Sequence, residues 1–111
     1  MLDLGYVAGL IDGEGCVTFF RYRKKDHLPD NWFYYPMVQV GMTHKQCVRM
    51  LWAEFSGTYK EITPKDGVRR PYGVWSLKGQ KCIDLLTSID KFLIVKQAEA
   101  RLLRRFGLIH L

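Results

Sequence analysis

Apolar and polar residues follow two different periods along the chain, and each period predicts one kind of element. Residues 3–13 predict a helix with Asp3 as its N-cap. Residues 16–25 are rich in β-branched and aromatic side chains and predict a strand, and residues 34–42 predict a second strand. A polar stretch joins the two strands as a long loop and contains Asp26, Pro29, Asp30 and Asn31.

The second half of the chain repeats the order of helix and strand pair. Val48, Leu51, Trp52 and Phe55 recur at helical spacing and predict a helix over 44–56. The remaining predicted elements are strands over 58–63 and 72–78, a turn over 64–70, and helices over 80–89 and 94–106.

This order predicts an α+β fold in which helices cover one face of a four-stranded, mostly antiparallel sheet. The opposite face of such a sheet stays open to solvent or to a ligand. The length of 111 residues suits a single domain over 1–111. No linker, low-complexity segment or longer repeat interrupts the pattern.

The net charge of +6 changes the picture, because a basic domain of this size is suited to a polyanionic partner. A basic protein that is merely soluble is the alternative. The distribution favours nucleic acid over a membrane surface, because basic residues are interleaved with aromatic ones. The clusters are Arg21, Arg23, Lys24 and Lys25 around Tyr22, Arg69 and Arg70 before Tyr72, and Arg101, Arg104 and Arg105 near the C-terminus.

Several classes of protein are disfavoured by the same composition. No apolar run reaches the ~18 residues that a membrane span needs. The first residues lack the pattern of a secretion signal, so we expect a cytoplasmic protein, or an organellar one if it is organelle-encoded. The three cysteines and three histidines have no metal-ligand spacing, which predicts free thiols and no zinc site.

The segment around the first helix carries the strongest chemical signal. Gly5, Gly9 and Gly13 recur every four residues and lie on one face of that helix. Each glycine costs a helix roughly 1 kcal/mol relative to alanine, so the stripe needs a compensating contact. Small side chains allow a second helix to approach closely. The stripe ends at Asp12 and Glu14, which suggests that two copies of the helix bring two carboxylates together.

The run Val7-Ala8-Gly9-Leu10-Ile11-Asp12-Gly13-Glu14-Gly15 resembles the signature of LAGLIDADG homing endonucleases. It departs from that signature at Val7, in place of the leading leucine, and at Glu14, in place of the second aspartate. The predicted order of elements matches the αββαββα core of that family. The segment Phe92–Ala100 is similar to the family's pattern before the last helix, where a lysine approaches the reacting phosphate.

A single copy of the motif implies a homodimer, because single-copy chains of the family act as homodimers. The expected dimer contact comprises Gly5, Ala8, Gly9, Asp12 and Gly13, related by a two-fold axis. Asp12 is expected to satisfy backbone groups at this contact. The alternative is that the glycine stripe packs against another helix of the same chain.

The resemblance also implies the chemistry of phosphodiester hydrolysis. Glu14 is the expected metal ligand and catalytic carboxylate, one from each chain, with help from the carbonyl of Gly13. The metal is Mg²⁺, for which Mn²⁺ can substitute, because hard cations prefer oxygen ligands. Lys96 is expected to stabilise negative charge at the phosphate, and His44 to order the attacking water. Each of these two side chains is equally well explained as a helix residue without a chemical role.

Strand alternation, counted from Glu14 as the resemblance implies, assigns side chains to a DNA-binding face. It places Arg21 and Arg23 on the core side, where we expect them to clear the core near the strand end and reach phosphates. The residues expected to contact DNA are Thr18, Phe20, Arg21, Tyr22, Arg23, Lys24, Lys25, Tyr35, Met37, Gln39, Tyr59, Glu61, Thr63, Arg69, Arg70 and Trp75.

The resulting prediction is a homodimeric, Mg²⁺-dependent endonuclease that makes a staggered break in a long, roughly palindromic double-stranded DNA target. A non-cleaving nucleic-acid-binding protein on the same fold, such as an RNA splicing cofactor or a DNA-binding regulator, is the alternative. A basic dimerisation module without a nucleic-acid role is disfavoured by the basic clusters.

Overall fold

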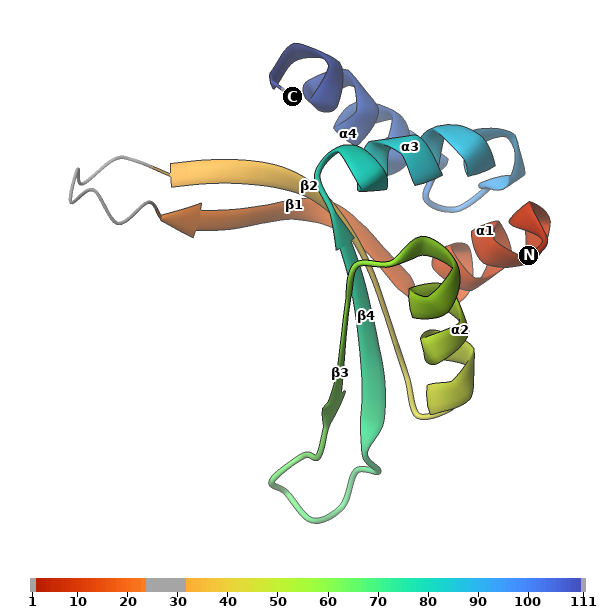
Figure 1. The fold of residues 1–111 in the computed structure, drawn as a ribbon, viewed down its shortest axis with the longest axis vertical. Coiled ribbons are helices and arrows are strands. Elements are labelled where there is room, and N and C mark those ends of the chain that lie inside the picture. Colours follow the sequence, from red (N-terminus) through yellow and green to blue (C-terminus); the bar gives the residue numbers. More distant parts are fainter. Residues whose placement is uncertain (1, 24–31, 111) are drawn as a thin grey trace.

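Four strands form one antiparallel sheet in a computed structural model that describes residues 2–23 and 32–110 (Figure 1). The strand order is β1-β2-β4-β3, and every neighbouring pair is antiparallel. The elements are α1 (Leu4–Glu14), β1 (Gly15–Arg23), β2 (Trp32–Met42), α2 (Lys45–Phe55), β3 (Thr58–Ile62), β4 (Tyr72–Lys78), α3 (Gln80–Ile89), the 3₁₀ turn η1 (Asp90–Phe92) and α4 (Gln97–His110). The predicted fold class and order of elements are confirmed.

The helices pack on one side of the sheet and leave its other side open (Figure 1). The α1 helix contributes Val7, Ala8 and Ile11 to the core, each with no exposed surface. These three residues lie on one face of the helix because apolar residues recur there at helical spacing. Facing side chains from the sheet are alternate residues of the central strands, such as Val38 and Val40.

The last helix begins at Gln97, three residues later than the start at 94 that the sequence predicted. The backbone N–H groups of Ile94 and Lys96 donate to the carboxylate of Asp12 instead of continuing a helix. The other element boundaries agree to within a few residues. The predicted loop residues Asp26, Pro29, Asp30 and Asn31 lie outside the described part of the chain.

Trp75 belongs to the core, so the expectation that it faces the open side of the sheet is wrong. It has no exposed surface, and its Nε1–H donates to the Ser56 carbonyl at 2.7 Å. That carbonyl lies in the short connection from α2 to β3, where Gly57 has a φ of +89°. A Cβ at Gly57 would lie 2.3 Å from the Ser76 carbonyl oxygen, so only glycine allows the two backbones to approach here.

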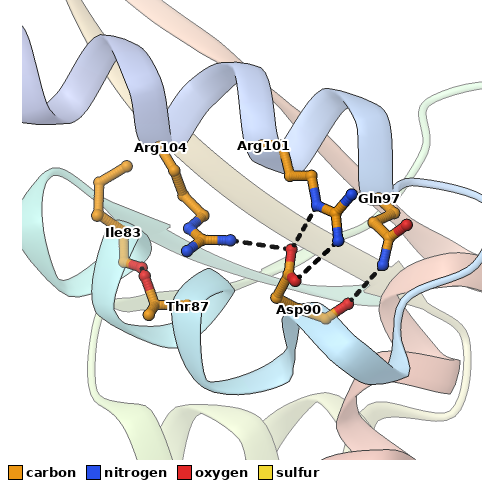
Figure 2. Close-up of polar contacts among 6 residues, drawn as sticks. All are labelled: Ile83, Thr87, Asp90, Gln97, Arg101 and Arg104. Atoms are coloured by element: carbon orange, nitrogen blue, oxygen red, sulfur yellow. Dashed lines mark hydrogen bonds and ion pairs between the residues drawn. The ribbon is translucent and has the colours of Figure 1, made fainter.

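The start of α4 is held against the end of α3 by a cluster of polar contacts centred on Asp90 (Figure 2). The Asp90 carboxylate accepts hydrogen bonds from Arg101 at 3.1 and 3.2 Å and from Arg104 at 2.9 Å. Its backbone carbonyl accepts from the Gln97 side chain at 3.0 Å. Hydrogen bonding from Arg101 is the main cause that lowers the pKa of the Asp90 carboxyl. Two arginines of the C-terminal cluster therefore have a structural role.

Replacing Trp75 by Phe should destabilise the fold by roughly 1–3 kcal/mol, because the Ser56 carbonyl loses its buried donor and part of the ring volume is lost. Trp52→Phe is the matched control, since Trp52 is 45% exposed and stacks on Tyr59 at the surface. The measurement is urea unfolding followed by circular dichroism. Equal midpoints for the two variants would contradict the core assignment of Trp75.

Candidate functional site

Glu14 is the last residue of α1, and its side chain is exposed. The helix ends because Gly15 turns directly into β1, and the Gly15 N–H donates to the Ile11 carbonyl. The carboxylate borders a recess of about 330 Å³, which we call the acidic recess. The residues that line it are Glu14, Gly41, Met42, Thr43 and Tyr72. The chain thus places a carboxylate where α1, the end of β2 and the start of β4 converge.

Asp12 joins the end of α1 to the segment that precedes α4. Its two carboxylate oxygens accept from the backbone N–H groups of Ile94 at 2.8 Å and Lys96 at 2.9 Å. The Lys96 ammonium donates in turn to the Asp12 backbone carbonyl at 2.7 Å. These contacts hold Lys96 at the C-terminal turn of α1, where a cation complements the helix dipole. Glu14 ends the same turn.

The environment of Asp12 favours its ionised form. Burial raises the pKa of this carboxyl. Hydrogen bonds from the backbone N–H groups of Ile94, Lys96 and Val95 and the charge of Lys96 lower it by more, so the net effect is a lowered pKa. Asp12 thus satisfies backbone groups as expected, and these groups belong to its own chain. Its place at a contact between two chains stays a prediction.

The exposed face of α1 differs from the predicted dimer contact at one further position. Ala8 is fully buried in the core and cannot contact a second chain. Gly9 and Gly13 are exposed, and within the described part of the chain a Cβ at either position would meet no atom within 4 Å. Gly5 is half-buried, and a Cβ there would lie 3.0 Å from Asp3 and 3.9 Å from Phe92. Bare backbone is consequently presented at Gly9 and Gly13.

Exposed apolar side chains flank these glycines. Tyr6 is 48% exposed on α1, and Ile94 and Val95 are 85% and 69% exposed on the segment that Asp12 holds. Branched apolar residues that lie mostly in water next to an open glycine face are typical of a protein contact surface. We call Tyr6, Gly9, Gly13, Ile94 and Val95 the α1 surface.

The open face of the sheet carries the side chains that alternation predicted for β1 and β2. Thr18 lies opposite Met37, and Phe20 lies opposite Tyr35. Val17 and Phe19 face the helices as expected. Gln39 shares the open face, and its partner on β4 is Ser76. The predicted orientation of these strands is confirmed, but Met37 is buried, with 9% of its surface exposed, so the expectation that it contacts DNA is corrected. Contact of the other residues with DNA stays a prediction.

The orientation predicted for β3 and β4 is wrong, because these strands are in the opposite phase. Tyr59 pairs with Trp75 on the helix side, where its ring stacks on Trp52 at 5.3 Å. Glu61 also points toward α2, where it accepts from Arg49 at 3.3 Å and pairs with Lys45 at 3.6 Å. A shift of one residue in strand phase turns every side chain to the other face.

The side chains that β3 and β4 do place on the open face were missed by the sequence analysis. They follow from the pairing of Gln39 with Ser76 and of Ser76 with Thr58. The apolar pair Trp75 and Leu77 was an available signal, since alternation assigns the residues between and beside them to the open face. The open-face residues of these strands are Thr58, Lys60, Ile62, Tyr72, Val74, Ser76 and Lys78.

The remaining predicted DNA contacts lie on strand ends and turns. Arg21 is exposed on the helix side of β1, opposite Tyr34. Thr63 follows the end of β3. Arg69 is exposed, and its guanidinium pairs with Asp66 at 2.7 Å in the turn before β4. Tyr22 and Arg23 lie in β1, but their side chains, together with Lys24 and Lys25, are outside the described part of the structure.

His44 is the N-cap of α2, a role for which the sequence offered only its position before the helix. Its Nδ1 accepts from the Cys47 N–H at 3.4 Å. His44 borders a second recess of about 410 Å³, lined by Thr43, His44, Lys45, Arg70 and Pro71. We call it the basic recess. It shares Thr43 with the acidic recess, so a carboxylate and a group of basic residues lie on neighbouring surfaces.

A divalent cation would find part of a donor set at the end of α1. Within residues 2–23 and 32–110, no three His, Cys, Asp or Glu side chains converge into a group that could hold a metal ion. The Glu14 carboxylate and the carbonyl of Gly13, in the last helical turn, are the hard oxygen donors that Mg²⁺ prefers. One chain therefore supplies fitting chemistry but too few ligands, and a second copy would double them.

Among the described helices, none is long and apolar enough to cross a bilayer.

Solved structures with this fold are found among LAGLIDADG homing endonucleases. The homing endonuclease I-CvuI in complex with its target matches 95% of this chain and 65% of its own, with a TM-score of 0.77 and 17% identity. The archaeal intron-encoded homing endonuclease I-Vdi141I, complexed with DNA, matches 95% of this chain and 66% of its own, with a TM-score of 0.73 and 17% identity. I-TnaI matches 97% and 73%, with a TM-score of 0.62 and 19% identity.

These comparisons establish the fold of the chain: it is that of LAGLIDADG homing endonucleases. The chain spans about 65% of the length of I-CvuI. No protein-family model matches the sequence. No curated protein matches it either.

Replacing Asp12 by Asn should destabilise the protein by about 1–2 kcal/mol, since the charged hydrogen bonds to Ile94 and Lys96 are weakened at a partly exposed site. Asp66→Asn is the control, because Asp66 bonds only locally, within its turn. The free energy of unfolding is measured in urea at neutral pH.

The effect of Asp12→Asn should also depend on pH. The pKa of folded Asp12 lies below that of an unfolded aspartate, about 3.9, so its stabilisation is present above that pH and is lost as pH falls through the folded value. The difference between wild type and Asp12→Asn should therefore shrink below about pH 4. A difference that is constant with pH would contradict the role assigned to the Asp12 carboxylate.

Proposed function

We propose that this protein is a homodimeric, divalent-metal-dependent DNA endonuclease that makes a staggered double-strand break at a specific site. The observation that carries the proposal is the exposed carboxylate of Glu14 at the end of a helix whose neighbouring surface is bare glycine backbone. The fold adds support, because I-CvuI and I-Vdi141I, which share it, were solved in complex with DNA.

The dimer is supported by the α1 surface. Gly9 and Gly13 leave room for a second backbone, and none of the described helices of the same chain fills that space. The exposed Ile94 and Val95 extend the surface with apolar area. A two-fold axis through this surface is an isologous contact, which brings the two copies of Glu14 toward each other.

Mg²⁺ fits this arrangement, because two carboxylates and two carbonyls would give it hard oxygen ligands from both chains. I-CvuI was also crystallised with Mg present and its DNA not cleaved. When bound, such ions stabilise the entering and leaving oxygens of a phosphodiester and relieve the repulsion between neighbouring carboxylates. Glu14 and the carbonyl of Gly13 would hold them.

Lys96 supplies a positive charge beside the same helix end. Its ammonium group now binds the Asp12 carbonyl at 2.7 Å, and a lysine so placed can also interact with a phosphate that approaches Glu14. His44 is held as a helix cap, with one ring nitrogen occupied by the Cys47 N–H. The cap does not use the other ring nitrogen, which is suited to bind water or phosphate oxygen.

The open face of the sheet provides the surface that would read the target. Thr18, Gln39 and Lys78 offer donors and acceptors on three neighbouring strands, and a twisted ribbon of this kind fits the major groove. Each subunit of a symmetric dimer would read one half-site, so a roughly palindromic target is expected.

Glu14→Gln should abolish cleavage while the fold is kept, because the amide keeps the shape of the carboxylate and removes its charge. Glu99→Gln is the control, since Glu99 is exposed on α4. Each protein is incubated with a randomised duplex library and Mg²⁺, and the broken ends are sequenced. Equal cutting by wild type and Glu14→Gln would refute the assignment. Binding of DNA or RNA without any break would favour a non-cleaving regulator or splicing cofactor.

Gly9→Ala should affect the monomer and the dimer in opposite directions. Alanine favours a helix over glycine by roughly 1 kcal/mol, and its Cβ meets nothing in the single chain, so the monomer should be stabilised. A close helix contact has no room for that methyl group, so dimerisation should weaken. Sedimentation over a concentration series measures dimerisation, and urea unfolding at the lowest concentration measures monomer stability. Unchanged dimerisation would contradict the proposed α1 contact.

A further inference from the structure

The basic recess brings together residues from two segments that are far apart in the sequence. Thr43, His44 and Lys45 connect β2 to α2, whereas Arg70 and Pro71 precede β4. The segments meet because the end of β2 pairs with the start of β4, with Met42 opposite Gly73. A recess of about 410 Å³ with Lys45, Arg70 and His44 on its walls is suited to an anion.

His44 adds a ring N–H donor to the charged side chains of Lys45 and Arg70. Its Nδ1 accepts the Cys47 N–H, so in the neutral ring the proton is on Nε2. That proton is available for an acceptor outside the cap. The imidazole therefore needs no net charge to bind an anion, and the cap fixes which nitrogen carries the hydrogen.

The surrounding charges leave the recess positive. Glu61 lies 3.6 Å from the Lys45 ammonium and 3.3 Å from the Arg49 guanidinium. Lys45, Arg49 and Arg70 thus outnumber the two described carboxylates, those of Glu61 and of Glu14 in the adjoining acidic recess. The Glu61 pair holds the Lys45 side chain, which is 31% exposed, beside the recess. Removing the Glu61 charge should consequently strengthen anion binding.

Resting on the proposed function, we propose that the basic recess binds a backbone phosphate of the target, next to the phosphate presented to Glu14. The acidic and basic recesses share Thr43, and Pro71 of one is followed by Tyr72 of the other. A strand that lies across the acidic recess would place a neighbouring phosphodiester beside Lys45 and Arg70. Such a contact positions the strand without reading its sequence.

The test compares Lys45→Gln/Arg70→Gln with the control pair Lys81→Gln/Arg105→Gln, both in the Glu14→Gln background so that no strand is cut. Lys81 and Arg105 are exposed on α3 and α4. Affinity for a duplex selected by wild type is measured by fluorescence anisotropy over a salt series. The variant loses one phosphate contact per subunit and two per dimer, so the slope of log K against log [salt] should fall by about 2, whereas the control pair should change it by less than about 1. Glu61→Gln should raise the affinity.

A second measurement locates the phosphate. Single uncharged methylphosphonates are placed along the duplex near the cut. One of them, beside the cleaved bond, should weaken binding by the Glu14→Gln parent and have little effect on the Lys45→Gln/Arg70→Gln variant. The phosphate site would be overturned if Lys45→Gln/Arg70→Gln and the control pair had equal salt slopes. It would also be overturned if each methylphosphonate weakened binding equally in the parent and in Lys45→Gln/Arg70→Gln. Neither result would contradict the endonuclease function.

Other outcomes separate the two proposals and the two sources of phosphate. If the Glu14→Gln protein binds the duplex but the wild-type protein does not cut it, the endonuclease proposal is refuted and the proposed phosphate site in the basic recess is still supported. A wild type that selects no duplex refutes both. A further outcome is that inorganic phosphate shifts the NMR signals of the His44 ring while Lys45→Gln/Arg70→Gln leaves the affinity for the duplex unchanged. This result would show a site for free phosphate and would overturn the assignment to a nucleic-acid strand.

Discussion

The carboxylate of Asp12 is the constraint on which the candidate site depends. It bonds the backbone N–H groups of Ile94 and Lys96, more than eighty residues away, and so joins the end of the first helix to the start of the last. The Lys96 ammonium returns to the carbonyl of Asp12. These reciprocal hydrogen bonds hold the end of α1 together with Ile94, Val95 and Lys96 beside Glu14.

Asp12 and Glu14 lie in the same sequence motif but have different surroundings in the structure. The Asp12 carboxylate accepts hydrogen bonds from backbone N–H groups of its own chain, whereas Glu14, two residues later, is exposed at the acidic recess. The glycines are divided in the same way. Gly9 and Gly13 present bare backbone, whereas the neighbouring Ala8 packs into the core. One helix thus packs into the core with one face and presents bare glycine backbone on another.

The two recesses extend the same logic to the sheet. The pairing of β2 with β4 brings the β2–α2 connection beside the segment before β4, so Thr43 borders both the carboxylate and the basic residues. In the proposed function, the acidic recess would hold the metal ion and the basic recess would hold a neighbouring phosphate. Neighbouring segments of the chain would then supply both the chemistry and the positioning of the strand.

The sequence by itself determined the order of elements, the α+β class, the glycine stripe and the place of Glu14 at the end of a helix. These follow from local periodicity and from a motif of consecutive residues. The faces of β1 and β2 were predicted correctly because they could be counted from Glu14. The faces of β3 and β4 could not be counted in this way, and Tyr59, Glu61 and Trp75 were placed on the wrong side. Strand phase depends on which residues pair, and pairing with β2 is decided only when the sheet forms. The partner of Asp12 and the convergence of His44, Lys45 and Arg70 were also decided by tertiary structure, because hydrogen bonds and charges across such sequence distances leave no periodic trace in the chain.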